Sequence, residues 1–329
     1  MKRNIRLAVR YMAGVLIALS LAGANGAYAA DYPAAGRTIK ILVGFSPGGI
    51  NDLMSRIFAE GLSQRLGVPV VVENKPGANG EIALAEAARA APDGYTLIAT
   101  TSALAATPIT SASFKYDVVD GYTHLGIIAQ TPYILAANGT MPFNDVRGMI
   151  AYAKANPGKL NFGAPVESTN LDFALLWQLA GITVTSIPYK GTAPATAATL
   201  ANEVQLTAVS HRAISPHLES GKLKALGFAS NKRFSLVPQI PTIAEAVKGY
   251  EATTLWVGFS GPKGIPLPIV TRLNSEFAAI LKQPAVRSQI VEKFAFEIVG
   301  STPDEMTADL RAARNRYNEA VRITGFKPQ

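Results

Sequence analysis

The chain has 329 residues and no cysteine, which excludes disulfide bonds and metal sites built from thiolates. Its three histidines, His124, His211 and His217, lack the spacing of metal ligands, so we expect neither a metal nor another cofactor. The formal net charge is +8, but four of the 31 basic residues and none of the 23 acidic ones lie in the first 30 positions, which leaves a mildly basic remainder without a nucleic-acid surface.

The first 29 residues have the layout of a cleavable secretory signal. Basic residues precede the apolar run 12–24, and Ala27-Tyr28-Ala29 follows as a site of the small-x-small type. The alternative is a membrane anchor, but Asn25 and neighbouring glycines end the apolar run before the roughly 20 residues that span a bilayer. We expect residues 1–29 to be removed and the protein to reach the periplasm.

The next segments alternate between strand and helix. Continuous apolar runs predict buried strands, and apolar residues at Leu53, Ile57, Phe58, Leu62 and Leu66 predict the inner face of a helix that ends at Gly67. The expected strands are 38–45, 68–74 and 95–102, and the expected helices are 50–67 and 81–90. This β-α-β-α-β order indicates an open α/β sheet.

The same alternation continues from residue 124 and predicts a second α/β unit. The expected strands there are 124–130, 133–138, 160–164, 184–190 and 204–210, with helices at 144–158, 169–181 and 193–203. A strand at 253–262 and helices at 268–284 and 303–321 complete the chain. About 300 residues normally form two lobes. We expect lobe 1 to comprise 30–130 plus 251–329 and lobe 2 to comprise 131–250, with more than one crossing between them.

Gly44-Phe45-Ser46-Pro47-Gly48 matches the G-x-S-x-G elbow of serine hydrolases. That elbow needs a backbone N–H on the residue after serine, which Pro47 lacks, and losing one such donor costs roughly 100- to 1,000-fold in turnover. We therefore expect no catalytic residue and no enzyme activity.

The alternative is a cradle of backbone N–H groups for an anion at a helix N-terminus. Gly48 and Gly49 let the backbone approach a ligand, and we expect Gly49 to need a positive φ. Ile50 and Asn51 open the helix, and Asp52 in its first turn is expected to cap that helix. A strand-to-helix turn without a ligand would have the same sequence, so the loop alone does not decide.

Seven stretches in register resemble the landmarks of the tripartite tricarboxylate transporter solute receptors, often called Bug receptors. They are VGFSPGGINDLMSR, VVVENKPGANG, ARAAPDGYTL, IPYKGTAPA, SGKLKALGF, IPTIAEA and LWVGFSGPKGIP, and they cover nearly the whole chain after residue 30. The resemblance implies a two-lobed α/β fold of the type II periplasmic-binding-protein (Venus-flytrap) kind, with a small organic acid in the cleft between the lobes.

The resemblance also implies positions for the ligand. In lobe 1 these are the loop from Phe45 to Asp52 and the strand end at Thr100, Thr101 and Ser102. The positions implied in lobe 2 are Ser168, Thr169, Asn170, Gly191, Thr192, Ser210 and His211. Thr192 before Ala193-Pro194 also has the sequence of an N-cap.

The departures from the family pattern all lie in lobe 2. Glu167 stands at an expected glycine, Ala201-Asn202-Glu203-Val204-Gln205 replaces Gly-Gly-Gln-Val-Asp, and Val209-Ser210 replaces Asp-Asn. These changes leave the far end of the ligand unassigned. Arg212 beside them would suit a second carboxylate, or would lie at the surface in solvent.

The leading hypothesis is a monomeric receptor that captures a small-molecule carboxylate and presents it to membrane transporter subunits. A receptor for a membrane kinase would use the same closed-cleft surface, and a Ser46 hydrolase is the enzyme alternative. Which carboxylate binds is not determined by the sequence.

Overall fold

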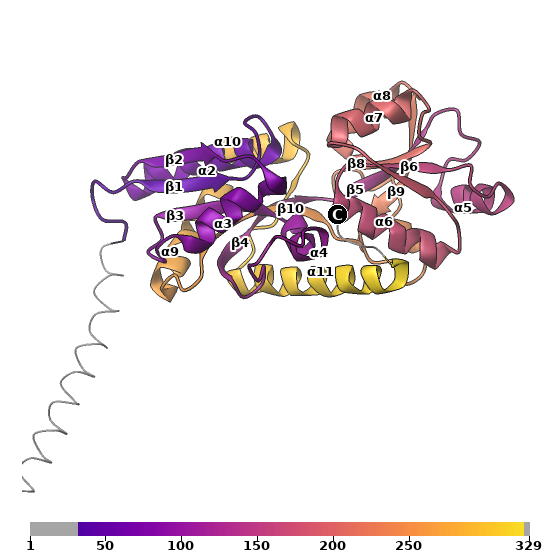
Figure 1. Ribbon diagram of the computed structural model, residues 1–329. Helices are drawn as coiled ribbons and strands as arrows, with labels where there is room; N and C mark the ends of the chain where they lie inside the picture. The colour runs from indigo at the N-terminus through magenta and orange to yellow at the C-terminus, as the bar shows by residue number, and fades with distance from the viewer. Residues whose placement is uncertain (1–31, 326–329) are drawn as a thin grey trace, which may run out of the picture.

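The computed structural model describes residues 32–325, so the expected signal peptide lies outside the described residues. Two lobes lie side by side, each built on its own β-sheet, and the colours in Figure 1 show that the chain enters the first lobe, crosses to the second and returns. Within 32–325 no helix is long and apolar enough to cross a membrane.

The first lobe contains a six-stranded sheet with the order β11-β4-β10-β3-β1-β2. Strand β1, next to the edge strand β2, pairs in parallel with β2 and β3, whereas β10 pairs antiparallel with both β3 and β4. The strands are β1 (Ile39–Val43), β2 (Val70–Asn74), β3 (Thr96–Thr101), β4 (Tyr122–Thr131), β10 (Leu255–Pro262) and β11 (Glu297–Ile298). The parallel part confirms the β-α-β-α-β prediction, and the late strand β10 makes the sheet mixed.

The second lobe contains a five-stranded sheet with the order β7-β6-β8-β5-β9. Its β6 is parallel to β7 and β8, and β5 is antiparallel to β8 and β9. The strands are β5 (Tyr133–Asn138), β6 (Asn161–Ala164), β7 (Thr185–Pro188), β8 (Leu206–Ser210) and β9 (Leu223–Ala229).

Helices cover both sheets. In the first lobe they are α2 (Ile50–Leu66), α3 (Glu81–Arg89), α4 (Thr107–Thr110), α9 (Leu267–Leu281), α10 (Pro284–Ser288) and α11 (Pro303–Thr324), with short 3₁₀ turns η1 (Ala78–Gly80) and η2 (Ser102–Ala106) and the π-helical turn η4 (Gln289–Lys293). In the second lobe they are α5 (Val146–Ala155), α6 (Glu167–Ala180), α7 (Thr192–Leu200), α8 (His211–Glu219) and the 3₁₀ turn η3 (Ile243–Glu245). The helix α8 and the strand β9 were not assigned from sequence.

The inner face of α2 differs from the prediction at one position. Phe58 and Leu62 are fully buried, but Leu53 is 36% exposed, and Met54 is buried in its place. A Cβ on Gly61 would lie 2.8 Å from Cγ1 of Ile280, so this glycine permits α2 and α9 to pack closely. The tight contact with α9 sets the rotation of α2 and turns Leu53 outward.

Three connections join the lobes. Two are chain crossings, from β4 to β5 through residue 132 and from β9 to β10 through residues 230–254. The third is packing: α11 runs along one side of both lobes to reach α6 (Figure 1), and Leu171 of α6 packs into the cluster that contains Leu310 and Tyr317 of α11. Trp256 at the start of β10 is buried in the same cluster, and its Nε1 donates to Asp309 Oδ2 at 2.7 Å. The long C-terminal helix therefore supports the junction.

Candidate functional site

The loop between β1 and α2 presents backbone groups to solvent. Residues 45–49 are exposed, and α2 begins at Ile50 after the cap residue Gly49. The first N–H groups of a helix have no intrahelical carbonyl, so those of Gly49, Ile50 and Asn51 are free of helix hydrogen bonds and lie at the positive end of the helix dipole. Asn51 as a whole is buried, so Gly49 and Ile50 are the more accessible of these three residues. This geometry suits an anion.

Asp52 holds the loop in shape. Its carboxylate is buried, accepts from the Gly48 N–H at 2.9 Å and from Asn74 Nδ2 at 3.0 Å, and pairs with Arg56 at 2.8 Å. Asn74 also donates to the Phe45 carbonyl at 3.1 Å. Burial alone would raise the pKa of Asp52, but the hydrogen bonds from Arg56, Gly48 and Asn74 outweigh burial and lower it. Asp52 is thus an ionised brace beneath the loop, and the Gly48 N–H is already used.

The positive φ predicted for Gly49 belongs instead to Gly48. Gly48 has φ +89°, whereas Gly49 has φ −75° and ψ 167°, an extended conformation open to any residue. The prediction was wrong by one residue. The chain reverses direction at Gly48, and Gly49 is the N-cap of α2, a position that takes an extended backbone.

The histidines give Ser46 no catalytic base in its own lobe. His124 is buried, with Nδ1 at 2.9 Å from Ser260 Oγ and Nε2 at 3.1 Å from the Val119 carbonyl, and burial lowers its pKa. His211 and His217 lie on α8 of the other lobe. The exposed Ser46 therefore has neither the histidine nor, because Pro47 follows it, the backbone donor of an elbow.

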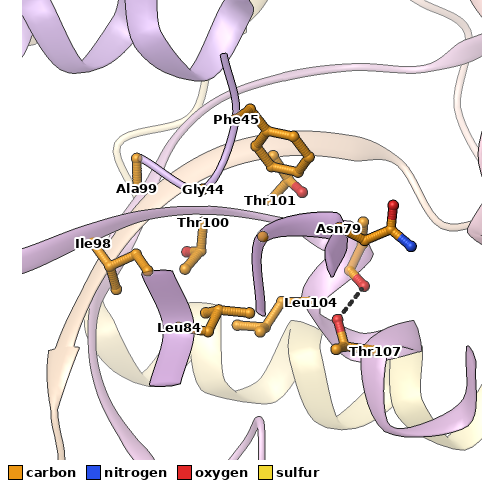
Figure 2. Close-up of a pocket in the computed structure, with 12 residues that line it drawn as sticks. Gly44, Phe45, Asn79, Leu84, Ile98, Ala99, Thr100, Thr101, Leu104 and Thr107 are labelled. Carbon is orange, nitrogen blue, oxygen red and sulfur yellow. Dashed lines mark hydrogen bonds between the residues drawn. The ribbon is translucent and has the colours of Figure 1, made fainter. Parts of the chain in front are cut away.

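A small recess lies beside this loop (Figure 2). It has a volume of about 40 Å³ and is lined mainly by apolar groups. The lining residues are Gly44, Phe45, Asn79, Gly80, Leu84, Ile98, Ala99, Thr100, Thr101, Ala103, Leu104 and Thr107. Thr101 thus lies next to the loop as predicted, while Ser102 begins η2 with its side chain buried.

The loop before α3 contributes to the recess, and sequence reasoning assigned it no site residue. Gly77, Ala78, Asn79 and Gly80 all have positive φ, between +45° and +135°. Two of these four are not glycine, and such strain is found where surrounding structure enforces it, often at binding sites. The two glycines that flank Ala78 and Asn79 in the printed sequence are the signal that could have identified this loop.

In the second lobe, the predicted segment 168–170 forms the first turn of α6. Thr169 is fully buried; its Oγ1 accepts from the Val166 N–H at 3.4 Å and donates to the Val166 carbonyl at 2.6 Å, so its hydroxyl is used at the N-terminus of its own helix. Ser168 is also buried, whereas Asn170 is partly exposed and donates to Glu167 Oε1 at 2.9 Å. Glu167 therefore meets a donor within its own helix.

The cap of α7 also differs from the prediction by one residue. Gly191, with φ +109°, is the N-cap and Thr192 is the first helical residue, without a capping hydrogen bond from its side chain. The Gly191 N–H donates to the Pro165 carbonyl at 3.1 Å. A positive φ at the cap favours glycine there and moves threonine into the helix.

Ser210 and His211 lie where β8 passes into α8. Ser210 is the N-cap and His211 the first helical residue. His211 lines a pocket of about 690 Å³ together with Ser215 and residues 236, 237, 239 and 240, and burial lowers its pKa. Its ring thus faces the α8 side of the lobe. Arg212 is exposed.

Strand pairing brings the predicted ligand positions of the first lobe and those of the second lobe to the same junction. Thr101 pairs with Val257 on β10, and Leu255 of the same strand pairs with Thr131 at the end of β4. Two residues later the chain enters β5, where Tyr133 pairs with Ser210. The edge of the first sheet that bears Thr101 and the edge of the second that bears Ser210 therefore both lie at the lobe junction. Within residues 32–325, no cluster of three or more His, Asp or Glu is placed to hold a metal ion.

The amino-acid sequence of the chain matches a known receptor family. A profile described as tripartite tricarboxylate transporter family receptor matches residues 54–322. The chain belongs to this family. The resemblance drawn from the seven sequence landmarks is thereby confirmed.

Individual relatives cover nearly the whole chain. BugT of Bordetella pertussis is 32% identical over 97% of this chain and 98% of its own length. Among solved structures, Rpa4515 of R. palustris with adipate is 31% identical, has a TM-score of 0.77 and covers 91% of this chain and 100% of that one. MatC of Rhodopseudomonas palustris with bound malate is 28% identical, with a TM-score of 0.71 and coverage of 87% and 99%. These similarities confirm the two-lobed fold of a periplasmic binding protein.

Proposed function

We propose that this protein is a periplasmic receptor that captures a small organic carboxylate between its lobes and delivers it to a tripartite tricarboxylate-type membrane transporter. The observation that carries the proposal is the loop 45–50, whose free N–H groups lie at the N-terminus of α2 in a chain of the receptor family. Relatives solved with adipate and malate support carboxylates as the ligand class.

The ligand is proposed to bind at the edges where the two sheets meet. In the first lobe the free N–H groups of Gly49, Ile50 and Asn51 and the Thr101 hydroxyl would hold one carboxylate. In the second lobe the exposed or partly exposed groups among the predicted positions, Asn170, Thr192 and Ser210, would contact the other end. Division into lobe 1 (30–130 plus 251–329) and lobe 2 (131–250) would then allow closure on the ligand about the crossings at 131–132 and 230–254.

Recognition rather than chemistry is the proposed role of this site. Ser46 has no N–H donor after it, and no histidine of its lobe is free to act as its base. Treatment with a serine-reactive fluorophosphonate should leave Ser46 unlabelled.

Export and a monomeric state are part of the same proposal. Residues 1–29 would be removed, leaving Ala30 or Asp31 as the mature N-terminus. Mass spectrometry of the periplasmic protein should find that terminus, and retention of Met1 would refute it. Size-exclusion chromatography with light scattering should give the mass of one chain.

Thermal-shift screening against mono-, di- and tricarboxylates, aliphatic and aromatic, tests the binding function. A ligand at 100 times its dissociation constant should add roughly 2.7 kcal/mol to the free energy of unfolding. Uptake of the best ligand should then be lost in cells that lack the receptor. Normal uptake with a lost transcriptional response would instead favour a sensor for a membrane kinase.

A further inference from the structure

We propose that the recess beside Phe45 is a ligand subsite that takes a small uncharged apolar group, of methyl to ethyl size, on the carbon next to the bound carboxylate. This inference rests on the proposed function, because it assumes that a carboxylate binds at the loop 46–50. It adds a chemical requirement on the ligand that the carboxylate loop alone does not impose.

The walls of the recess set its chemistry. The side chains of Leu84, Ile98 and Leu104 and the ring of Phe45 line it, and no charged residue is among the lining groups. Figure 2 shows Leu84 and Leu104 at one end and the Phe45 ring at the other. An ionised group would lose its hydration here without gaining a partner, so the recess favours an apolar group.

Two of the three threonine hydroxyls that line the recess are already hydrogen-bonded. Thr100 donates to the Gly258 carbonyl at 3.5 Å and Thr107 to the Ala103 carbonyl at 3.4 Å. Among residues 32–325, only two lining side chains with polar groups have no hydrogen-bond partner, namely Thr101 and Asn79. Asn79 is exposed and Thr101 partly exposed, so they are available to the carboxylate-bearing part of a ligand.

The size of the recess limits the group. A volume of about 40 Å³ is roughly a quarter of the approximately 150 Å³ of a protein cavity that takes benzene, so one or two carbon atoms fit. Close backbone contact prevents expansion. A Cβ on Gly44 would lie 2.7 Å from Gly80 Cα, and one on Gly80 would lie 3.6 Å from Phe45 Cζ.

The strained loop at 77–80 maintains this contact. Ala78, at φ +45°, and Asn79, at φ +51° and ψ +30°, lie between two glycines, and Gly80 at φ +93° carries the chain under Phe45. Left-handed backbone at consecutive residues persists only where neighbours enforce it. The recess therefore has a shape fixed by the two loops that form it. It lies beside the proposed carboxylate position, because Phe45 lines it and directly precedes the carboxylate-binding residues.

Matched pairs of acids test the subsite by isothermal titration calorimetry. The probes are propionate and 2-methylpropionate, succinate and 2-methylsuccinate, and adipate and 2-methyladipate. Burial of one methyl group should make the methylated acid of each binding pair about fourfold tighter. In succinates of increasing 2-substituent, affinity should fall again at 2-phenylsuccinate, which exceeds the recess.

Two variants locate the effect. Ala103 lines the recess and is partly buried, so Ala103→Leu should fill it and bring the ratio of the two dissociation constants to about one. Ala285→Leu, the same change at an exposed position of α10, should leave the ratio as in the wild type. Thermal melting establishes that both variants fold, and the size series in wild-type protein does not depend on either.

The outcomes separate the two proposals. Equal affinities within each pair, with clear binding of the unbranched acid, would overturn the subsite and leave the receptor function intact. A methyl preference that survives in a folded Ala103→Leu variant would place the group elsewhere and also overturn it. Failure of every acid to bind would overturn the carboxylate function itself, and the subsite with it.

Discussion

The hydroxyl of Tyr317 on α11 lies 3.4 Å from Oδ2 of Asp172 on α6, so a fully buried hydrogen bond joins the C-terminal helix to the second lobe. Tyr133, Tyr250, Thr253 and Arg316 surround the same carboxylate from β5, the 230–254 crossing and α11. Burial raises the pKa of Asp172 to about 7, although the charge of Arg316, the nearby polar groups of Thr253 and the hydrogen bond from Tyr317 lower it in part.

This carboxylate predicts a pH-dependent stability. The folded pKa of about 7 exceeds the ordinary value of 3.8, so the folded state holds the proton more tightly than the unfolded chain. The stability it contributes is fully present below pH 3.8 and is lost as pH rises to 7. Asp172→Asn, which keeps a neutral side chain of the same shape, should therefore raise the melting temperature by several degrees at pH 8 and little near pH 4.

Differential scanning calorimetry from pH 4 to pH 8 measures this effect. The difference between the folded and the ordinary pKa of Asp172 corresponds to at most about 4 kcal/mol in the free energy of unfolding between pH 4 and pH 8. Asp304→Asn, at an exposed position in the first turn of α11, is the control and should show no such trend. An Asp172→Asn variant that is less stable than wild type at pH 8 would show that the carboxylate is ionised and favourably paired.

Much of the fold follows from local sequence patterns, and each exception has a physical cause. The first βαβαβ unit was predictable because β1 and β3 are continuous apolar runs buried on both faces and the edge strand β2 has the same β-branched composition. The helix α8 was missed because it contains Pro216 and has only Ile214 fully buried, so its apolar periodicity is weak. The antiparallel insertion of β10 was also hidden, because strand direction depends on partners distant in sequence.

The candidate site was predictable as a set of loops but less so as individual contacts. Glycine and proline mark the loop at 44–49. Which glycine takes the positive φ depends on the hydrogen bond that the Gly48 N–H donates to the Asp52 carboxylate, and this contact is not visible in the sequence pattern. Thr169 matched the expected polar pattern, but its hydroxyl is consumed by its own helix. The recess could not be predicted at all, because it forms between Gly44 and Gly80, which meet only in the folded protein.

The two glycines of the loop predict opposite mutational outcomes. Gly48→Ala places a side chain at φ +89°, which costs about 1–2 kcal/mol in the loop and should weaken carboxylate binding several-fold. Gly49→Ala, at φ −75°, should bind within about twofold of wild type. Calorimetry with the best acid from the thermal-shift screen compares them. Greater loss in Gly49→Ala would mean that the ligand approaches that Cα directly.

Ser46 is predicted to contribute modestly to binding. Its exposed hydroxyl follows Phe45 at the start of the loop, where one hydrogen bond to the ligand or to a bridging water is worth about 0.5–1.5 kcal/mol. Ser46→Ala should thus weaken binding by at most roughly tenfold. A complete loss of binding with an intact melting temperature would show that the side chain, and not the backbone, is the main anion contact.

Ligand specificity is predicted to reside in the second lobe, where the chain departs from its family pattern. The exposed Arg212 follows Ser210 and His211 at the junction end of β8. As a solvated charge it would add under about 1 kcal/mol, whereas a charge-assisted contact with a second carboxylate would add roughly 1.5–3 kcal/mol. We expect Arg212→Ala to weaken the best dicarboxylate more than the best monocarboxylate, and Ser210→Ala to change the ranking of acids. His211→Ala should have the smallest effect, because its ring lines the pocket along α8.

Calorimetry on the three variants with both ligands measures these changes in affinity. Equal small losses for both acids would place Arg212 outside the site, and an unchanged ranking in all three variants would refute the assignment of specificity to this lobe.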